Sequence, residues 1–277
     1  MTSPESGPRR RRRARLALIV LTMLASCGAA RPARAQQPFL VDDAEVTPLR
    51  GWHLELSSQV DVLRAAARPA RWQNVFEWEV NYGAGARIEL AALLPVVSIV
   101  SDVAGRRASA HGIGDATLAA KWRLTRDPGA RHATALSAIL EIPSGSRARG
   151  LGTGLVDYGL NLVSQHQVHS RATVRLNGGA LLAGNTQTGA VGIRERGTVL
   201  TTGASVVTPL TPAVQVGGEL TMAWSQKASL GGSAVGWQIG TNITVRQGVT
   251  VDASVLGGWF DASPRVGLQI GMSADLR

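Results

Sequence analysis

The sequence predicts an all-β protein, a transmembrane antiparallel up-and-down β-barrel of about 12 strands preceded by a signal peptide. Segments of about ten residues alternate between apolar and polar side chains along most of the chain. The connections between these segments alternate between long and short. Beyond the N-terminus there is no apolar run of the ~18 residues that a membrane-spanning helix needs.

The segment 264–277 shows the alternation most clearly. One face carries Val266, Leu268, Ile270, Met272, Ala274 and Leu276. The other face carries Gln269, Ser273 and Asp275 among small and charged residues. Successive side chains of a strand point to opposite sides, so this strand is predicted to meet lipid on one face and a polar interior on the other.

Residues 1–35 have the features of a signal peptide. A cationic stretch, Arg9–Arg15, precedes an apolar stretch, Leu16–Ser26, and Ala33-Arg34-Ala35 offers a cleavage site before Gln36. Leu24-Ala25-Ser26-Cys27 provides an alternative, because this pattern would place a lipid on Cys27. Both routes export the chain, and together with the barrel they predict a location in the outer membrane of a Gram-negative cell.

The rest of the chain divides into two parts. Residues 36–50 contain too many strand breakers, Pro38 among them, and are predicted as a periplasmic lead-in. Residues 51–277 are predicted as the barrel. Its expected strands are 51–62, 72–82, 86–94, 113–124, 133–142, 155–167, 172–182, 197–207, 213–224, 233–246, 249–259 and 264–277.

The connections and the aromatic residues support the membrane assignment. Long connections such as 95–112 and 143–154 alternate with short ones such as 83–85 and 247–248, as in barrels with outer loops and periplasmic turns. With both termini in the periplasm, the aromatic residues collect at two levels, as interfacial girdles do, and only Trp78 lies nearer the middle. The periplasmic level holds Trp52, Tyr82 and Trp122, and the outer level holds Trp72, Phe76, Trp224, Trp237 and Trp259.

Composition excludes several other classes. Removing residues 1–35 leaves 21 basic and 18 acidic residues, a net charge of +3 instead of +10, which is no signature of nucleic-acid binding. The only cysteine is Cys27, so neither a disulfide framework nor a thiolate metal site is expected. The glycines at 150, 152 and 154 do not fit a dinucleotide fingerprint. We therefore expect no cofactor and no metal.

The inward-facing charges are the candidate lumen-lining residues. Their arrangement fits two interpretations: a polar path for small-molecule solutes, or a lumen that ion pairs fill and close. Four acids are predicted toward the outer mouth: Asp61, Asp115, Glu141 and Asp157. The others are predicted deeper or on the opposite wall: Glu77, Glu79, Arg87, Glu89, Lys121, Arg123, Arg175 and Glu219.

The predicted outer loops are rich in arginine. Guanidinium groups bind phosphate bidentately, so these loops fit contact with lipopolysaccharide, besides the membrane lipid around the barrel. Solvated loops in an arginine-biased protein are the alternative interpretation. The residues are Arg64, Arg68, Arg71, Arg106, Arg107, Arg147, Arg149, Arg194 and Arg196.

An enzymatic function is the less favoured hypothesis. A membrane-embedded acyl hydrolase needs a Ser–His pair near the outer rim. Only His111 is predicted there, near Ser109 and Asp115, and in a loop that positions no base. We therefore expect no enzyme and name no catalytic residues.

Several short motifs resemble a known family. They begin with Pro38–Asp43 before Gly51-Trp52 and continue through most of the chain. The others are Gly112-Ile113-Gly114-Asp115, Lys121-Trp122-Arg123, Ile142-Pro143-Ser144-Gly145, Gly152-Thr153-Gly154 and Asp157-Tyr158-Gly159. In these the chain resembles the outer-membrane transporters grouped under the MetA pathway of phenol degradation. The resemblance implies passage of aromatic or other hydrophobic small molecules and brings no catalytic residues.

The end of the chain departs from what many barrels show. They finish on an aromatic residue that the barrel-assembly machinery recognises, whereas this chain finishes on Leu276-Arg277. The assembly machinery remains an expected partner.

Overall fold

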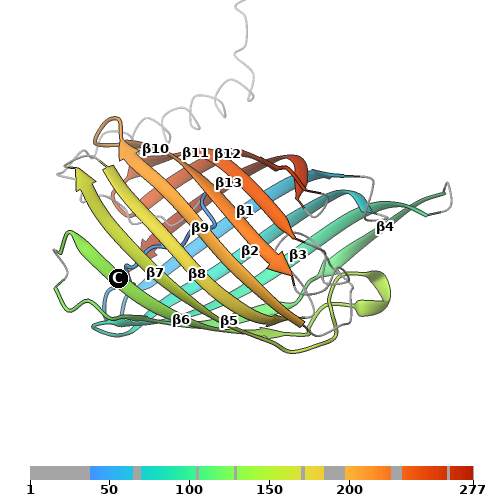
Figure 1. Ribbon diagram of the computed structural model, residues 1–277, viewed down its shortest axis with the longest axis horizontal. Helices are drawn as coiled ribbons and strands as arrows, with labels where there is room; N and C mark the ends of the chain where they lie inside the picture. Colours follow the sequence, from blue (N-terminus) through green and yellow to red (C-terminus); the bar gives the residue numbers. More distant parts are fainter. Residues whose placement is uncertain are drawn as a thin grey trace, which may run out of the picture.

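A computed structural model describes the protein as a closed antiparallel barrel of 12 strands, with a thirteenth strand in a hairpin that extends past the ring (Figure 1). The described residues are 38–64, 70–103, 106–127, 130–169, 172–183, 197–225, 233–260 and 263–276. The predicted signal peptide and Cys27 lie outside them. The strands are β1 (Trp52–Leu63), β2 (Ala70–Gly85), β3 (Ile88–Val103), β4 (Arg106–Ile113), β5 (Ala116–Arg123), β6 (His132–Ile142), β7 (Asp157–His169), β8 (Ala172–Ala183), β9 (Gly197–Pro209), β10 (Val214–Ser225), β11 (Ala234–Arg246), β12 (Val249–Gly258) and β13 (Pro264–Leu276).

The ring closes between the last strand and the first. β1 pairs along its whole length with β13, from Trp52 opposite Leu276 onward, and on its other side with β2. Hydrocarbon offers no partner for backbone N–H or C=O groups, and closure pairs the strands of the ring on both sides, while β4 pairs with β3 alone. The predicted fold class is therefore confirmed. Within the described residues no helix is long and apolar enough to cross a membrane.

The two faces of the wall meet different surroundings. Leu220 is 55% exposed on the outside, whereas its neighbour Glu219 is 5% exposed on the inside. On β11, Ile239 is 64% exposed and Gln238 only 3%. The strand alternation read from the sequence thus gives an apolar exterior and a polar, packed interior.

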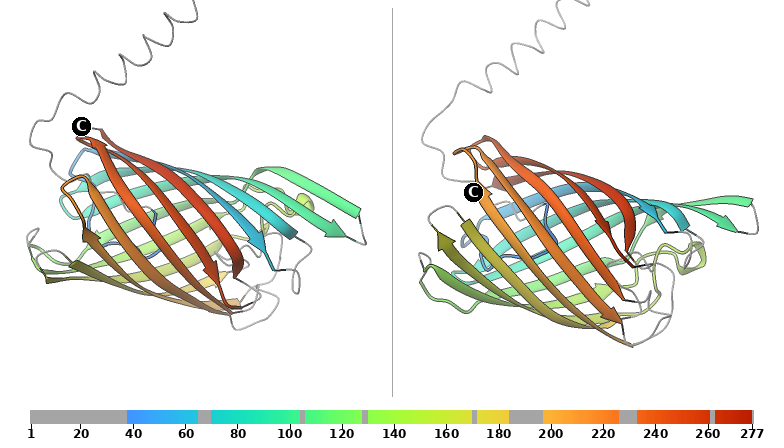
Figure 2. Two further views of the ribbon diagram at one scale, coloured as in Figure 1. Left: turned by 90° about the horizontal axis from the view of Figure 1, so that it is seen from above. Right: turned by 45° about the horizontal axis from the view of Figure 1, so that its top comes forward.

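One part of the wall differs from the prediction. The stretch 95–112, predicted as a loop, forms the second half of β3 and the strand β4, and this hairpin extends past the other strands (Figures 1 and 2). The first half of β3 pairs with β5 instead, so β4 and β5 share one position in the ring. Between them the chain bends at Gly114, where a Cβ atom would lie 3.0 Å from side-chain atoms of Pro95 and Val97. The predicted strand 113–124 is therefore interrupted.

Candidate functional site: the occupied lumen

Residues 38–50, called the lumen segment below, lie inside the barrel (Figure 2). The sequence predicts a lead-in separate from the barrel here, and the described part of it crosses the lumen from β3 to β11. Before β1 the chain turns back at Arg50, which has a φ of 62°, and the Arg50 N–H donates to the Gly83 carbonyl at 2.8 Å. Four apolar side chains of the segment are buried, Phe39, Val41, Ala44 and Val46, whereas Leu40 and Leu49 are exposed.

Two barrel carboxylates bind the backbone of the lumen segment. The carboxylate of Glu219 accepts the N–H groups of Leu40 at 3.0 Å and of Val41 at 2.9 Å. The carboxylate of Glu89 accepts both the N–H and the hydroxyl of Thr47, each at 2.7 Å. Buried N–H groups without acceptors would be costly, so these carboxylates stabilise the segment at both ends of its path.

Three barrel cations pair with the acidic side chains of the lumen segment. Lys121 Nζ lies 2.7 Å from Asp42 Oδ1 and 3.7 Å from Glu89 Oε1. Arg123 lies 2.6 Å from the carboxylate of Glu45. A looser pair joins Arg175 to Asp43 Oδ2 at 3.5 Å. All these side chains are largely buried, and breaking one partner of such a pair leaves a buried charge.

Glycines on three adjacent strands make room for the lumen segment. A Cβ atom on Gly203 would lie 2.7 Å from Val41 Cγ2, and one on Gly217 would lie 2.8 Å from Phe39 Cζ. On Gly240 it would lie 2.5 Å from Pro38 Cγ. Distances this short exclude a side chain, so the inner wall of β9, β10 and β11 accommodates the segment closely.

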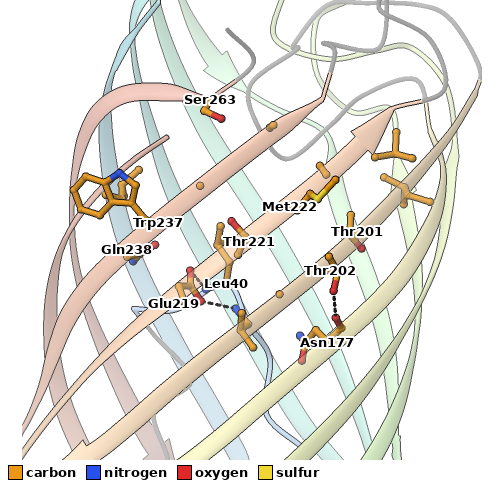
Figure 3. Close-up of a pocket in the computed structure, with 18 of the residues that line it drawn as sticks. Leu40, Asn177, Thr201, Thr202, Glu219, Thr221, Met222, Trp237, Gln238 and Ser263 are labelled. Atoms are coloured by element: carbon orange, nitrogen blue, oxygen red, sulfur yellow. Dashed lines mark hydrogen bonds between the residues drawn. The ribbon is translucent and has the colours of Figure 1, made fainter. Parts of the chain in front are cut away.

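A cavity lies beside the lumen segment, toward the long connections. It holds about 1300 Å³ of empty space, part of it open to solvent, and Leu40 and Val41 contribute to its lining. Figure 3 shows Glu219 beside Leu40 at this surface, with Thr201, Thr221 and Gln238 around the space. The wall is of mixed character, with apolar side chains such as Leu181 and Met222 among uncharged polar ones. Besides Glu219 it contains one acid, Asp61, which accepts hydrogen bonds from Gln59 and Gln73.

The wall formed by β1 and β2 is acidic. Glu55 stands opposite Glu79 in the strand register, and Glu77 accepts a hydrogen bond from the Ser57 hydroxyl at 3.4 Å. His53 bridges two carboxylates, with Nε2 2.9 Å from Glu55 and Nδ1 2.6 Å from Asp275. The cations Lys121, Arg123 and Arg175 lie on other strands, β5 and β8.

The remaining candidate residues lie near the ends of the barrel. Arg87 occupies the turn before β3, with its guanidinium directed to the Leu124 carbonyl at 3.5 Å, and so lies at the rim. Asp115 accepts hydrogen bonds from the Gly145 and Thr153 N–H groups at 2.9 and 2.7 Å. It therefore fixes the connection 143–156. Glu141 and Asp157 are opposite each other in the register of β6 and β7.

A Ser–His pair is present on the outer face of the hairpin. Ser98 Oγ and His111 Nδ1 are 2.7 Å apart, instead of the grouping with Ser109 and Asp115 expected from the sequence. The nearby Asn74 amide donates to Ser58 and to the Gln59 carbonyl. Within the described residues no acid or amide contacts the other nitrogen of His111. Without an orienting group, the pair does not form the triad that acyl hydrolysis requires.

The residues that sequence reasoning missed are the acids of the lumen segment: Asp42, Asp43 and Glu45. Three cations on the inner faces of β5 and β8 were the available signal, since buried charges need partners. The segment brings these acids together with Lys121 and Arg175, which lie far from them in the sequence.

Residues 71–276 match the family described as "Putative MetA-pathway of phenol degradation". The chain belongs to this family. The resemblance read from the motifs is thereby confirmed, although the match begins after the lumen segment. No curated protein matches the chain in sequence.

Solved structures share the barrel of this family member. The COG4313 outer membrane channel from Pseudomonas putida F1 aligns with a TM-score of 0.65 at 15% identity, covering 84% of this chain and 98% of that one. The NanC porin aligns with a TM-score of 0.52 at 10% identity, covering 80% and 98%. At such identities the likeness concerns the fold. Together with the apolar exterior, it confirms the predicted location in the outer membrane.

Proposed function

We propose that this chain is an outer-membrane channel for small molecules, and that the lumen segment gates it. The observation that carries the proposal is an interior cavity that ends on the lumen segment, whose contacts with the barrel wall are hydrogen bonds and ion pairs and can open reversibly. Membership of a family named for phenol degradation favours hydrophobic or aromatic solutes. Passage requires that the lumen segment leave its place or shift within the barrel.

A permanently closed structural barrel is the second candidate function. The burial of the lumen segment and its ion pairs favour it. The two candidates differ in whether movement of the segment opens a path.

A reversible disulfide separates these functions. A Cβ atom at position 203 would lie 2.7 Å from Val41 Cγ2, which is too close for unbonded atoms but close to the separation between a Cβ atom and the partner sulfur across a disulfide. The variant Val41→Cys/Gly203→Cys can therefore form the bond. We expect the reduced variant to conduct in planar bilayers and to swell liposomes with phenol as solute, and the oxidised variant to do neither. The Val41→Cys variant alone is the control, and its conductance should be the same under reducing and oxidising conditions.

Two results would refute the proposal. Absence of conductance in both states would support the closed barrel instead. Equal conductance in both states would show that solutes pass the segment without its movement, and the gating role would fail.

We further propose that exposed arginines at the long connections bind lipopolysaccharide phosphates. Arg106 and Arg107 on β4 and Arg147 and Arg149 after β6 are exposed to solvent, whereas Arg71 pairs with Asp102 at 2.7 Å. Arg68, Arg194 and Arg196 lie outside the described residues. Loss of lipopolysaccharide co-purification in a variant with the four exposed arginines changed to Gln tests this. The barrel-assembly machinery is the proposed partner for insertion.

A further inference from the structure

On the inner faces of four adjacent strands, β5 to β8, apolar and basic side chains form a patch that faces the lumen. Arg123 on β5 is opposite Ala135 on β6, which is opposite Val163 on β7. Lys121 lies two residues from Arg123 on the same inner face, and Arg175 flanks the far side on β8. The patch therefore has an apolar centre between cations on both sides. We call it the cation-flanked patch.

The lumen segment occupies the cation-flanked patch in a complementary way. Its carboxylates at Asp42, Asp43 and Glu45 contact the three cations. Between them the methyl group of Ala44, which is 0% exposed, packs against Ala133, Ala135 and Val163. Apolar groups thus meet the centre of the patch, and carboxylates meet its flanks.

We propose that the cation-flanked patch is a binding site for small apolar carboxylates, for which the lumen segment is the built-in competitor. Guanidinium groups bind carboxylates with charge-assisted and often bidentate hydrogen bonds. An aliphatic or aromatic body of the ligand takes the place of the Ala44 methyl on the alanine and valine side chains. The inference deepens the proposed channel function, on which it rests.

Competition explains why the acids of the lumen segment matter. A ligand that binds only when the segment has left has an apparent affinity reduced by the fraction of time that the site is free. Withdrawal of the segment removes one carboxylate from each of the three cations. A carboxylate solute restores these contacts, so it favours the open state, while a neutral molecule of the same shape does not.

The test uses benzoate as the probe and isothermal titration calorimetry on the detergent-solubilised mature protein. The variant Asp42→Asn/Asp43→Asn/Glu45→Gln weakens the competitor and is expected to bind benzoate at least tenfold tighter than the native chain. Adding Arg123→Met to this variant should abolish the gain. Adding Arg87→Met, which removes a cation at the rim, should leave it unchanged. Benzyl alcohol, the neutral control, has the same ring but no carboxylate and should bind the triple variant at least tenfold more weakly than benzoate does.

Three results would overturn the site: equal benzoate binding by the native chain and the variant, a gain that survives Arg123→Met, or benzyl alcohol binding to the variant as tightly as benzoate. If the triple variant does not fold, Glu45→Gln alone provides the test, with at least threefold tighter binding expected. Calorimetry measures benzoate binding whether or not the barrel conducts. Benzoate binding in a protein that never conducts would refute the channel and keep the site. Conductance without a gain in benzoate binding would refute the site and keep the channel.

Discussion

Glu219 provides the sharpest test of how the lumen segment is held. Its carboxylate accepts the Leu40 and Val41 N–H groups at 3.0 and 2.9 Å, and Glu219 is only 5% exposed. Glu219→Gln retains one acceptor oxygen and leaves one N–H group without a partner. Glu219→Ala leaves both without one.

The expected magnitude follows from the number of unpaired groups. A buried donor without an acceptor costs about 1–3 kcal/mol. Since 1.4 kcal/mol is about a factor of ten in an equilibrium constant, Glu219→Gln should shift the segment toward release by roughly 5- to 150-fold. Glu219→Ala should shift it further, because the second N–H group adds a comparable cost.

Hydrogen exchange measures this release directly. Amides exchange when local opening exposes them, so mass spectrometry of peptides covering the lumen segment should show faster exchange by these factors. Asp61→Asn is the matched control. It also removes a lumen carboxylate, but the hydrogen bonds that Asp61 accepts come from Gln59 and Gln73. Unchanged exchange in both Glu219 variants, or an equal increase in Asp61→Asn, would refute the reasoning.

Two further predictions concern the wall and the outer connections. Leu220→Arg places a charge on the lipid face and should lower the free energy of unfolding in lipid vesicles by about 2–4 kcal/mol, whereas Thr221→Arg directs the side chain into the cavity and should change it little. Urea titrations of the two variants measure the difference, and equal stabilities would contradict the assigned faces. Asp115→Ala leaves two N–H groups of the connection 143–156 without an acceptor, at about 1–3 kcal/mol each. Trypsin should therefore cut at the arginines of that connection at least ten times faster, and the Asp102→Ala control should cut there at the native rate.

The strands could be predicted because the side-chain pattern of each strand depends on what lies on its own two faces. Neighbouring side chains such as Glu219 and Leu220 face the interior and the lipid in turn, so polar and apolar residues alternate along the sequence of the strand. The β3–β4 hairpin escaped prediction because it extends past the ring. There the alternation weakens, and the Gly, Ser and Arg content resembles that of a loop.

The lumen segment could not be predicted, for a different reason. Its conformation has no period, since its backbone N–H groups donate to side chains of the barrel or of the segment itself, and only Arg50, at its end, donates to a strand carbonyl. The pairs that hold it join residues such as Asp42 and Lys121, 79 positions apart, and nothing local marks them as partners. The sequence shows the charges of Lys121 and Glu219, but it does not show that residues 38–50 are the segment that contacts them.

The order in which the chain is made has a consequence for how this interior is filled. Leu40 and its acceptor on β10 are separated by 179 residues, and the Pro38 carbonyl and Gln238 by 200. The segment is synthesised before the barrel strands, yet its last contacts arise only when the C-terminal strands have formed. Contacts so distant in sequence form late in folding. The segment can therefore take its final place only after β10 and β11 have formed, and a bulky tag fused just ahead of Pro38 would hinder this step more than one inserted into an outer connection.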